Sequence, residues 1–378
     1  MGPSRKVAII GAGAASFGAA QVLRELGVPF EVFEKSRGVG GRLATRRIQV
    51  GSDLAEVSFD HGAQFISCFS QEFGEKILPQ VEQGALRSFF ERNGTPRWIS
   101  PRGMNALAKS LAQDLGFDTR LRRETRVIEI QKLEDGFFLK CEHAGKEGTE
   151  TQGPFDHVLL TAPVPQALEL LDQSRDALSL GAGSKADWEG LRSVHYYPCI
   201  AWMVAFPDAH LSESWLKGPG YLALEEGVDS QMISWIASNR KKGLPSAAGI
   251  ESLTVHLNPK ASNVHFTGAG STGFRNVVLK ELVALGVLQG QISPEPVAEA
   301  VHRWRYSQPV EQYPDSFFSI PLSRAPLGSD STGDVPGIGR IVLCGDAFRG
   351  ARVEGAFLSG RNAALHLRPS LVSERGQD

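Results

Sequence analysis

The stretch that decides the fold is KVAIIGAGAASFGAAQVLRELGVPFEVFEKSRGVGGR, residues 6–42. A short apolar run leads into a glycine-rich turn, Gly11-Ala12-Gly13, and a helix rich in small residues is predicted over 14–26. A second apolar run, 30–33, ends at the acid Glu34. Strand, glycine turn, helix, strand and acid follow one another here as they do in a dinucleotide-binding unit. The sequence therefore predicts an α/β fold with a Rossmann-like domain.

Each position of this turn has a physical reason. Gly11 allows the sharp bend, and Gly13 lets the backbone approach a pyrophosphate with no Cβ in the way. The N–H groups that open the helix would face that anion, and Glu34 would accept hydrogen bonds from a ribose. Ser16 stands where the pattern has a third glycine, so we expect a slight helix displacement within a working site. The expected cofactor contacts in this region are Gly11, Gly13, Ala14, Ala15, Ser16, Glu34 and Lys35.

A second glycine turn, residues 38–42, follows the acid within a few residues. A second turn that carries an arginine suits FAD, which has more to wrap than NAD has. We expect Gly41 and Arg42 to contact the cofactor, with the Arg42 guanidinium binding the pyrophosphate as a bidentate cation. A basic surface loop is the alternative interpretation. The cofactor that the two turns together indicate is FAD.

The end of the chain repeats the strand-to-helix pattern. Residues 340–344 are predicted as a strand that leads into Gly345-Asp346, where a carboxylate could bind the ribitol of FAD. A helix predicted over 355–367 follows, and its positive end would favour the negative charge at the N1–C2=O side of a reduced flavin. A capped packing helix with no ligand is the alternative. The expected flavin contacts are Gly345, Asp346, Val353, Glu354, Gly355 and Ala356.

Composition sets the outer limits of the function. The chain has 378 residues, of which 42% are hydrophobic, and a net charge of −2, so no electrostatic argument for nucleic acid exists. Its four cysteines are far apart, which argues against zinc and against a disulfide framework. With no signal peptide and no apolar run of about 18 residues, we expect a cytoplasmic protein with a small-molecule substrate and no membrane partner.

Pattern along the chain predicts a discontinuous architecture. An FAD-binding domain is expected from residues 1–65, 102–165 and 335–370, and a substrate domain from 66–101 and 166–334. Strands are expected at 59–66, 125–131, 137–142, 155–161, 199–206, 231–237 and 251–257. Helices are expected at 69–90, 103–115, 271–286 and 294–303, and loops at 259–272 and 327–334.

Several runs make the chain similar to the bacterial renalase-like flavoproteins of the amine oxidase superfamily. They are KSRGVGGR at 35–42, FDHGAQFI at 59–66, APVPQA at 162–167, HRWRY at 302–306, and CGD with RVEGAFLSG over 344–360. The resemblance covers nearly the whole chain and implies a para-hydroxybenzoate-hydroxylase-like fold with a second α+β domain and non-covalent FAD. The further cofactor contacts expected on this basis are Gly62, Ala63, Gln64, Val127, Ala162 and Pro163.

The resemblance also implies a reaction. Characterised members oxidise dihydronicotinamides with hydride at ring carbon 2 or 6, so 2- or 6-dihydroNAD(P) is the expected substrate and O2 the expected acceptor, giving hydrogen peroxide. Such a hydride transfer needs positioning over flavin N5 and no general base. Gln64, Asn239 and His256 are the candidate substrate-facing residues, and satisfied core or edge residues are the alternative for each.

Two other functions remain open at this point. An amine oxidase or a desaturase could use the same scaffold, although the aromatics nearest the C-terminal motif, Phe348 and Phe357, are not the tyrosines typical of amine oxidases. A non-catalytic scaffold protein with a flavin fold is the third possibility. The intact Gly345-Asp346 turn argues against it, because such a protein need not keep a site that tunes the flavin.

Overall fold

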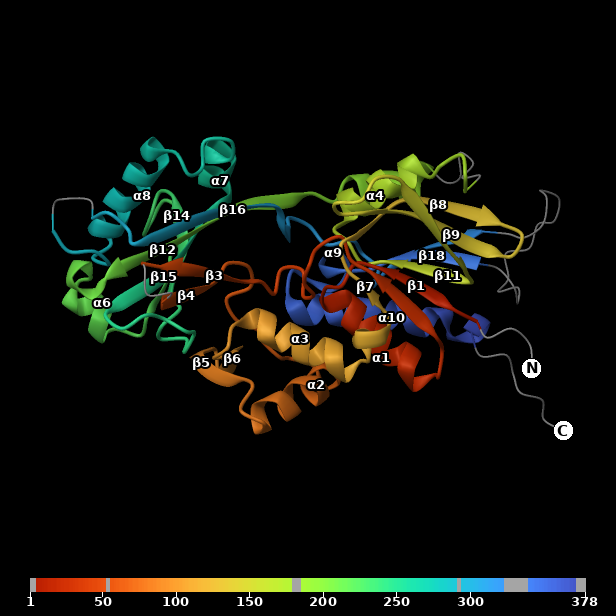
Figure 1. The fold of residues 1–378 in the computed structure, drawn as a ribbon, viewed down its shortest axis with the longest axis horizontal. Coiled ribbons are helices and arrows are strands. Elements are labelled where there is room, and N and C mark those ends of the chain that lie inside the picture. The colour runs from red at the N-terminus through yellow and green to blue at the C-terminus, as the bar shows by residue number, and fades with distance from the viewer. Residues whose placement is uncertain (1–4, 52–54, 179–184, 291–293, 323–338, 372–378) are drawn as a thin grey trace. The chain divides into compact units, whose positions relative to one another are not determined.

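The computed structural model describes residues 5–51, 55–178, 185–290, 294–322 and 339–371. The chain forms two compact units (Figure 1). Unit 1 comprises Met1–Gly41, Ala108–His195 and Pro309–Asp378, and unit 2 comprises Arg42–Leu107 and Tyr196–Gln308. The predicted cofactor and substrate domains alternate along the chain in the same way with other boundaries, and their division of labour stays a prediction.

Unit 1 is built on a six-stranded sheet in the order β17-β18-β11-β1-β2-β7. All neighbouring strands are parallel except for the antiparallel edge pair β17–β18. A parallel sheet is covered on both faces, which is why its central strands read as short, continuous apolar runs. The strands are β1 (Val7–Ile10), β2 (Phe30–Phe33), β7 (Leu121–Arg122), β11 (His157–Leu160), β17 (Phe318–Leu322) and β18 (Gly339–Leu343).

Helices α1 (Ala14–Glu25) and α10 (Val353–Leu371) lie side by side in unit 1 (Figure 1). A Cβ on Gly18 would lie 1.9 Å from the carbonyl oxygen of Phe357, and a Cβ on Gly360 would lie 1.8 Å from that of Ala15. The two backbones therefore touch, and this contact joins the first helix of the chain to the last.

The rest of unit 1 is a second layer and short helices. A three-stranded sheet has the order β10-β9-β8, in which both pairs are antiparallel. These elements are β8 (Thr125–Leu133), β9 (Gly136–His143), β10 (Thr149–Phe155), α4 (Val164–Gln173), α5 (Lys185–Arg192) and α9 (Asp346–Arg349). Helix α3 (Met104–Asp114) starts in unit 2.

Unit 2 is built on a five-stranded sheet in the order β13-β14-β15-β12-β16. Its strands are β12 (Tyr196–Pro207), β13 (Tyr221–Ala223), β14 (Ile233–Ser238), β15 (Ile250–Leu257) and β16 (Ala298–Pro309). Two hairpins are β3 (Thr45–Val50) with β4 (Ala55–Asp60) and β5 (Arg87–Arg92) with β6 (Thr95–Ile99). The helices are α2 (Gln71–Glu82), α6 (Glu213–Lys217), α7 (Pro259–His265) and α8 (Thr272–Ala284).

The two faces of this sheet differ, because successive side chains point to opposite sides. One face carries Trp202, Ile236 and Val255 and packs in an apolar core with residues of α6, α7 and α8. On the other face, Met203 and Ala298 pack against Val57 and Phe59, the latter two from hairpin strand β4. We call the remainder of this second face the site face; it carries Ala201, Tyr221, Trp235, His256, His302 and Trp304.

Most predicted elements are confirmed, and four predictions are wrong in whole or in part. Residues 298–309 form strand β16 where a helix over 294–303 was predicted, and 69–90 divides into α2 and the start of β5. The predicted loop 259–272 contains α7, which Asn258 caps by accepting a hydrogen bond from the Ala261 N–H at 2.8 Å. The strand predicted over 59–66 ends at Asp60, and the loop predicted at 327–334 lies outside the described residues.

Candidate cofactor and substrate sites

Four parallel strands of unit 1 end at one edge of the sheet, and a predicted cofactor segment follows each of them. The register continues past the strand ends, with Thr161 N–H donating to the Ile10 carbonyl at 3.0 Å and Gly11 N–H to the Phe33 carbonyl at 2.8 Å. Cys344 N–H donates to the Leu160 carbonyl at 2.9 Å. The turns at 11–13, 34–36, 161–163 and 345–346 therefore share this edge, where open parallel sheets bind their ligands.

The first glycine turn has the geometry that a pyrophosphate needs. Gly11 has a φ of +105°, and a Cβ there would lie 2.5 Å from Thr161 Oγ1, so only glycine fits. A Cβ on Gly13 would meet no atom within 4 Å, and the start of α1 has neither a capping side chain nor an acid in its first turn. Uncapped N–H groups that face open space suit an anion.

Glu34 is held at this turn although it lies on the next strand. Its buried carboxylate accepts from Ala12 N–H at 2.9 Å and from Ser36 N–H at 2.8 Å. The second glycine turn packs on the first, because Gly40 N–H donates to the Ala12 carbonyl at 2.7 Å. A Cβ on Gly41 would lie 3.6 Å from the Cα of Gly13. The two turns and the acid thus form one cradle.

The other predicted contacts of unit 1 vary in their surroundings. Strand β8 starts beside the acid, because Thr125 N–H donates to the Glu34 carbonyl at 2.9 Å, and Val127 follows as a buried residue. Lys35 is exposed. Ser16 is buried and donates to the Gly13 carbonyl at 2.6 Å, a bond that a third glycine could not make. Ala162 and Pro163 lead from β11 into α4.

The C-terminal turn is as closely fitted as the first. Gly345 N–H donates to Ser359 Oγ at 2.9 Å, and that hydroxyl donates to the Ser316 carbonyl at 2.7 Å. A Cβ on Gly355 would lie 2.3 Å from the Gly350 carbonyl oxygen, so the start of α10 rests on backbone. Asp346 is buried at the start of α9. The buried residues Glu354 and Ala356 and their neighbour Val353 form the first turn of α10.

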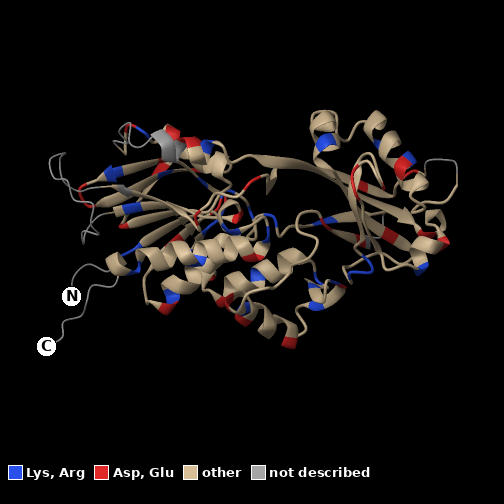
Figure 2. Cartoon of the chain, turned by 180° about the vertical axis from the view of Figure 1, so that it is seen from behind, with Lys and Arg blue, Asp and Glu red and all other residues tan. Residues whose placement is uncertain are grey.

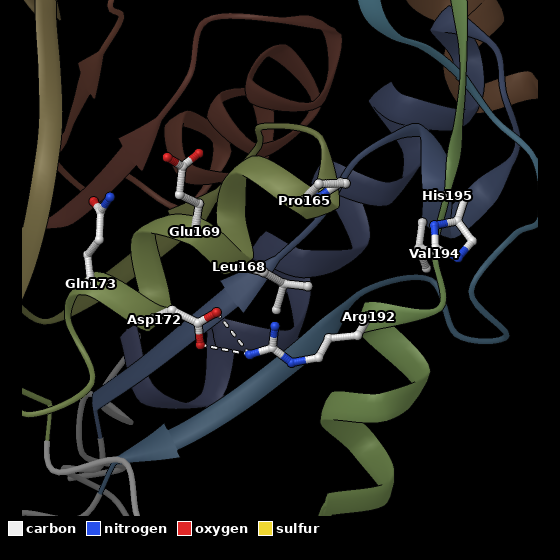
Figure 3. Close-up of a pocket in the computed structure, with 8 residues that line it drawn as sticks. All are labelled: Pro165, Leu168, Glu169, Asp172, Gln173, Arg192, Val194 and His195. Atoms are coloured by element: carbon white, nitrogen blue, oxygen red, sulfur yellow. Dashed lines mark hydrogen bonds and ion pairs between the residues drawn. The ribbon is translucent and has the colours of Figure 1, made fainter. Parts of the chain in front are cut away.

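The structure describes a groove of about 670 Å³ in unit 1, shown in Figure 3. Asp172 and Arg192 form an ion pair at 2.8 Å on its wall. None of the predicted cofactor residues lines it. The lining residues are Pro165, Leu168, Glu169, Asp172, Gln173, Arg192, Val194 and His195.

In unit 2, the segment that follows β4 is fixed by its neighbours. Ala63 N–H donates to the Arg42 carbonyl at 2.9 Å, and a Cβ on Gly62 would lie 2.0 Å from that oxygen. The Arg42 guanidinium donates to the Ser307 carbonyl at 2.8 Å. Gln64 is buried, and its Nε2 donates to the Asp60 carbonyl at 2.6 Å. A glycine is required at position 62 because two backbone segments touch there.

Three polar atoms of the 61–64 segment and its neighbour Trp235 are buried without a hydrogen-bond partner among the residues that the structure describes. They are Gln64 Oε1, an acceptor, Trp235 Nε1, a donor, and His61 Nδ1. Gln64 is next to Phe65, whose ring centroid lies 5.6 Å from that of Trp235. Trp235 is also the direct cross-strand partner of His256. A buried polar group that lacks a partner costs about 1–3 kcal/mol, so each of these atoms would be stabilised by a hydrogen bond from a ligand.

The histidines of the site face are uncharged near neutral pH. Burial lowers the pKa of His256 to about 4, and its Nε2 lies 3.2 Å from the His61 carbonyl. Burial also lowers the pKa of His61 to about 3, and His61 stacks on Trp304 with centroids 5.5 Å apart. The wall that these rings form is therefore neutral and aromatic.

Asn239 lies beneath this wall with its amide fully engaged. Its Oδ1 accepts from Asp60 N–H at 3.0 Å, and its Nδ2 donates to the Ser252 carbonyl at 3.1 Å and to Thr254 Oγ1 at 3.0 Å. The side chain is wholly buried and has no donor left for a substrate. The structure thus places Gln64 and His256 on the wall and Asn239 in the network that supports it.

Sequence reasoning missed the members of that network. Asp60, Lys242 and Thr254 are wholly buried, and none belongs to a motif with a spacing that predicts contact. It also missed Thr161 and Ser359, which hold the two glycine turns of unit 1. The APVPQA and RVEGAFLSG runs pointed to these two neighbourhoods without naming the residues.

Charge distribution, candidate metal ligands and helix length further characterise the described residues. Lysine and arginine alternate with aspartate and glutamate along the elements of both units (Figure 2). Across the described ranges, no group of three or more His, Cys, Asp or Glu could hold a metal ion. None of the helices described is long and apolar enough to cross a bilayer.

Comparison with known proteins supports the flavin interpretation. A family model for flavin containing amine oxidoreductases matches residues 69–367, and a model for NAD(P)-binding Rossmann-like domains matches 9–77. Renalase from Mus musculus is 25% identical over 367 residues, which are 94% of this chain and 96% of that protein. The predicted Rossmann-like α/β fold is confirmed.

Solved structures show the same fold at low identity. A putative protoporphyrinogen oxidase from Exiguobacterium sp. 255-15 has a TM-score of 0.61 at 13% identity, with 96% of this chain and 98% of that chain covered. Cyclohexylamine oxidase from Brevibacterium oxydans IH-35A has a TM-score of 0.60 at 14% identity, with 98% and 100% covered. The cofactor is FAD, the chain is an oxidoreductase rather than a non-catalytic scaffold, and it belongs to the flavin-containing amine oxidoreductase family.

Proposed function

We propose that the chain is an FAD-dependent oxidase of dihydronicotinamide isomers. Its substrate would be 2- or 6-dihydroNAD(P), which loses a hydride and leaves as NAD(P)⁺, and O2 would take the electrons to give hydrogen peroxide. Bound FAD supplies the hydride acceptor and the reaction with oxygen. The chain supplies binding, orientation and exclusion of water. Similarity to a renalase over 94% of the chain supports this choice of substrate.

The observation that carries the proposal is the unpartnered pair of polar atoms on and beside the site face. Trp235 Nε1 can donate one hydrogen bond, and Gln64 Oε1 can accept one. A primary carboxamide offers both a carbonyl acceptor and an N–H donor, so the nicotinamide amide would satisfy both atoms. A neutral amine suits the indole N–H less well, because that bond would occupy the nitrogen lone pair that assists hydride loss.

The charge state of the wall agrees with the proposed reaction. Hydride loss turns a neutral dihydropyridine into a pyridinium, so a cation develops in the substrate ring. The lowered pKa values of His61 and His256 keep both imidazoles uncharged near neutral pH, and neither would repel that cation. With Nε2–H of His256 donating to the His61 carbonyl, its Nδ1 is an acceptor for the substrate.

The FAD contacts proposed for unit 1 are those of the cradle and the C-terminal turn. Backbone N–H groups at 13–16 would bind the pyrophosphate, Glu34 the adenosine ribose and Asp346 the ribitol, while the start of α10 would face the N1–C2=O side of the isoalloxazine. Arg42, Gly62, Ala63 and Gln64 stay predicted FAD contacts on the basis of the sequence resemblance. Asn239 is proposed as a positioning residue.

Amine oxidation is the second candidate, and one observation favours it. Phe90, Tyr221 and Trp235 form an aromatic cluster in which Tyr221 stacks on each of the other two rings, with centroids 4.3 Å apart for Phe90 and 5.5 Å for Trp235. Ring faces of this kind attract apolar amines as well as flat heterocycles. The choice between the two substrate classes therefore falls to a direct experiment.

The test is anaerobic mixing of the yellow holoenzyme with a panel of donors. The panel contains 2- and 6-dihydroNAD(P), ordinary NADH and simple amines, and the loss of flavin absorbance is followed. We expect fast bleaching by the dihydronicotinamide isomers. Bleaching by amines alone would reject the proposal.

A matched pair of variants tests the carboxamide contact. Trp235→Phe keeps the ring and removes the N–H, and we expect the isomers to lose at least about tenfold in kcat/KM, or 1.4 kcal/mol. Trp215→Phe is the control, because the indole nitrogen of Trp215 is also buried without a partner but lies in the helix-covered core. An equal loss in both variants would contradict the assignment.

A further inference from the structure

Unit 2 contains a buried ion pair that the hydride transfer does not use. Lys242 lies in the turn between β14 and β15, and its Nζ lies 2.7 Å from Oδ2 of Asp60 at the end of β4. Both side chains are 0% exposed. Burial lowers the pKa of Lys242, and the charge of Asp60 opposes that shift.

Stability alone does not account for such a pair. Each buried ion loses several kcal/mol of hydration, and a well-packed apolar pair of similar volume is often as stable or more so. Loss of one partner, by contrast, strands the other charge and costs about 3–5 kcal/mol. The best-attested gain from a buried pair is that it selects one arrangement of the segments that it joins.

The segments joined here carry the site face. The second carboxylate oxygen of Asp60 accepts from Thr45 Oγ1 at 2.6 Å and from Met104 N–H at 2.8 Å, at the start of α3. The Asp60 carbonyl accepts from Gln64 Nε2 at 2.6 Å and from Thr254 Oγ1 at 2.9 Å. The next carbonyl, that of His61, accepts from Trp304 Nε1 at 2.8 Å, and His256 Nε2 lies 3.2 Å from it.

We propose that the Asp60–Lys242 pair is the positioning device of the substrate wall. It fixes the carbonyls of Asp60 and His61, and these two carbonyls orient Gln64, His256 and Trp304. Lys242 is a positioning residue, because its contact is with Asp60. This inference rests on the proposal that Gln64 and His256 face the substrate, but not on which substrate that is.

The Lys242 charge also acts on the imidazole of His256. The groups that face His256 are the carbonyl and imidazole of His61, Trp235 and Ala201 on the neighbouring strands, and the Lys242 ammonium with its Asp60 partner. Burial is the largest cause of the lowered pKa of His256, and the Lys242 cation lowers it further. Removal of the cation would therefore raise that pKa.

The experiment compares three variants of the holoenzyme without substrate. Lys242→Met strands Asp60, whereas Asp60→Asn combined with Lys242→Met removes both charges. Lys241→Met is the matched control, because Lys241 lies in the same turn and donates to the carbonyls of Trp215, Leu216 and Gly218 instead. Hydrogen exchange of the amides at 60–66, the His256 pKa by NMR and the melting temperature are measured.

The double variant separates positioning from stability. We expect it to melt within a few degrees of the wild type and to exchange the 60–66 amides at least about tenfold faster. Lys242→Met, which keeps the Asp60 carboxylate, should raise the His256 pKa, and Lys241→Met should change neither quantity. Wild-type exchange in the double variant together with an unchanged His256 pKa in Lys242→Met would overturn the proposal. These measurements need no substrate, so a failure of the dihydronicotinamide assay leaves them interpretable.

Discussion

The two units build their sites by different means. In unit 1 the cradle and the helices around it depend on close backbone approach: glycines at 11, 18, 355 and 360 stand where a Cβ would lie within about 2.5 Å of a neighbouring atom. In unit 2 the wall is held by side chains, with Asp60, Asn239 and Thr254 bonded to one another across the sheet. A site made of backbone can be identified from a local sequence motif, whereas a site held by a side-chain network depends on contacts that only the fold reveals.

The largest effect should come from Gly360→Ala in unit 1. Its new Cβ would lie 1.8 Å from the carbonyl oxygen of Ala15. The clash is with backbone, so it could be relieved only if helix α1 or helix α10 moved as a whole. We expect a loss of at least about 3 kcal/mol in the free energy of unfolding, and little soluble protein. Thermal melts of the purified chain measure it. A native melting curve would show that the helix crossing tolerates a side chain.

Gly13→Ala is the contrasting change in the same unit. Its Cβ would meet no protein atom within 4 Å, and the φ of −95° suits alanine, so the apoprotein should melt as the wild type does. The methyl group would instead occupy the space of the pyrophosphate. We expect FAD affinity to fall at least about tenfold, or 1.4 kcal/mol, in a fluorescence titration. Unchanged affinity would remove Gly13 from the proposed site.

In unit 2 the equivalent test removes one hydroxyl. Thr254→Val keeps the shape and leaves the Asp60 carbonyl and Asn239 Nδ2 each without one partner. We expect a loss of about 1–3 kcal/mol in stability with FAD affinity unchanged. Denaturant unfolding gives the first quantity and a flavin titration the second. Thr254→Ser keeps the hydroxyl and serves as the control; it should retain most of the stability.

These contrasts explain how much the sequence could predict. The turn at 11–13, the acid Glu34 and the Gly345-Asp346 turn were found because each needs a particular residue at a particular chain distance. The start of strand β16 was mistaken for a helix. Many of its residues are polar and only partly buried, so apolar and polar residues do not alternate strictly along it. Asn239 was singled out as a substrate contact because a sequence cannot show that Asp60, 179 residues away, already occupies its amide.

Acid should destabilise both units, through the buried histidines His157 in unit 1 and His61 and His256 in unit 2. Burial lowers the pKa of His157 in unit 1 to about 3, as it does for His61 in unit 2. An unfolded histidine titrates near pH 6.5, so below that pH the unfolded chain binds protons that the native chain does not. The contribution of these histidines to the free energy of unfolding is complete above about pH 6.5. Below that pH it decreases as the pH decreases, by at most about 1.4 kcal/mol per pH unit for each histidine.

Denaturant unfolding between about pH 6.5 and about pH 4.5 measures this slope. His157→Gln can still bond Arg340 N–H and Ser370 Oγ, the two partners of the imidazole, and it cannot be protonated. In this variant the free energy of unfolding should change less steeply with pH, because one proton fewer is taken up on unfolding. A slope that stays the same would mean that unit 2 alone carries the acid response.

The smallest effect is expected from Ser16→Gly, which restores the usual motif. The variant loses the bond from Ser16 to the Gly13 carbonyl and gains backbone freedom in a helix, so stability should fall by about 1 kcal/mol. FAD affinity should stay within about twofold, because the serine hydroxyl points to the protein. A large gain in affinity by titration would show that the serine does displace the helix.

The contact between helices α1 and α10 limits how early unit 1 can be completed during synthesis. The 342 positions from Gly18 in α1 to Gly360 in α10 take about 20–70 s to translate at about 5–20 residues per second. Strand β18 and helix α10 come after every segment of unit 2, so unit 2 can close on the ribosome while α1 still waits for its partner. The pairing of β18 with β11 and the packing of α10 on α1 are thus the last contacts of unit 1 that the growing chain can make.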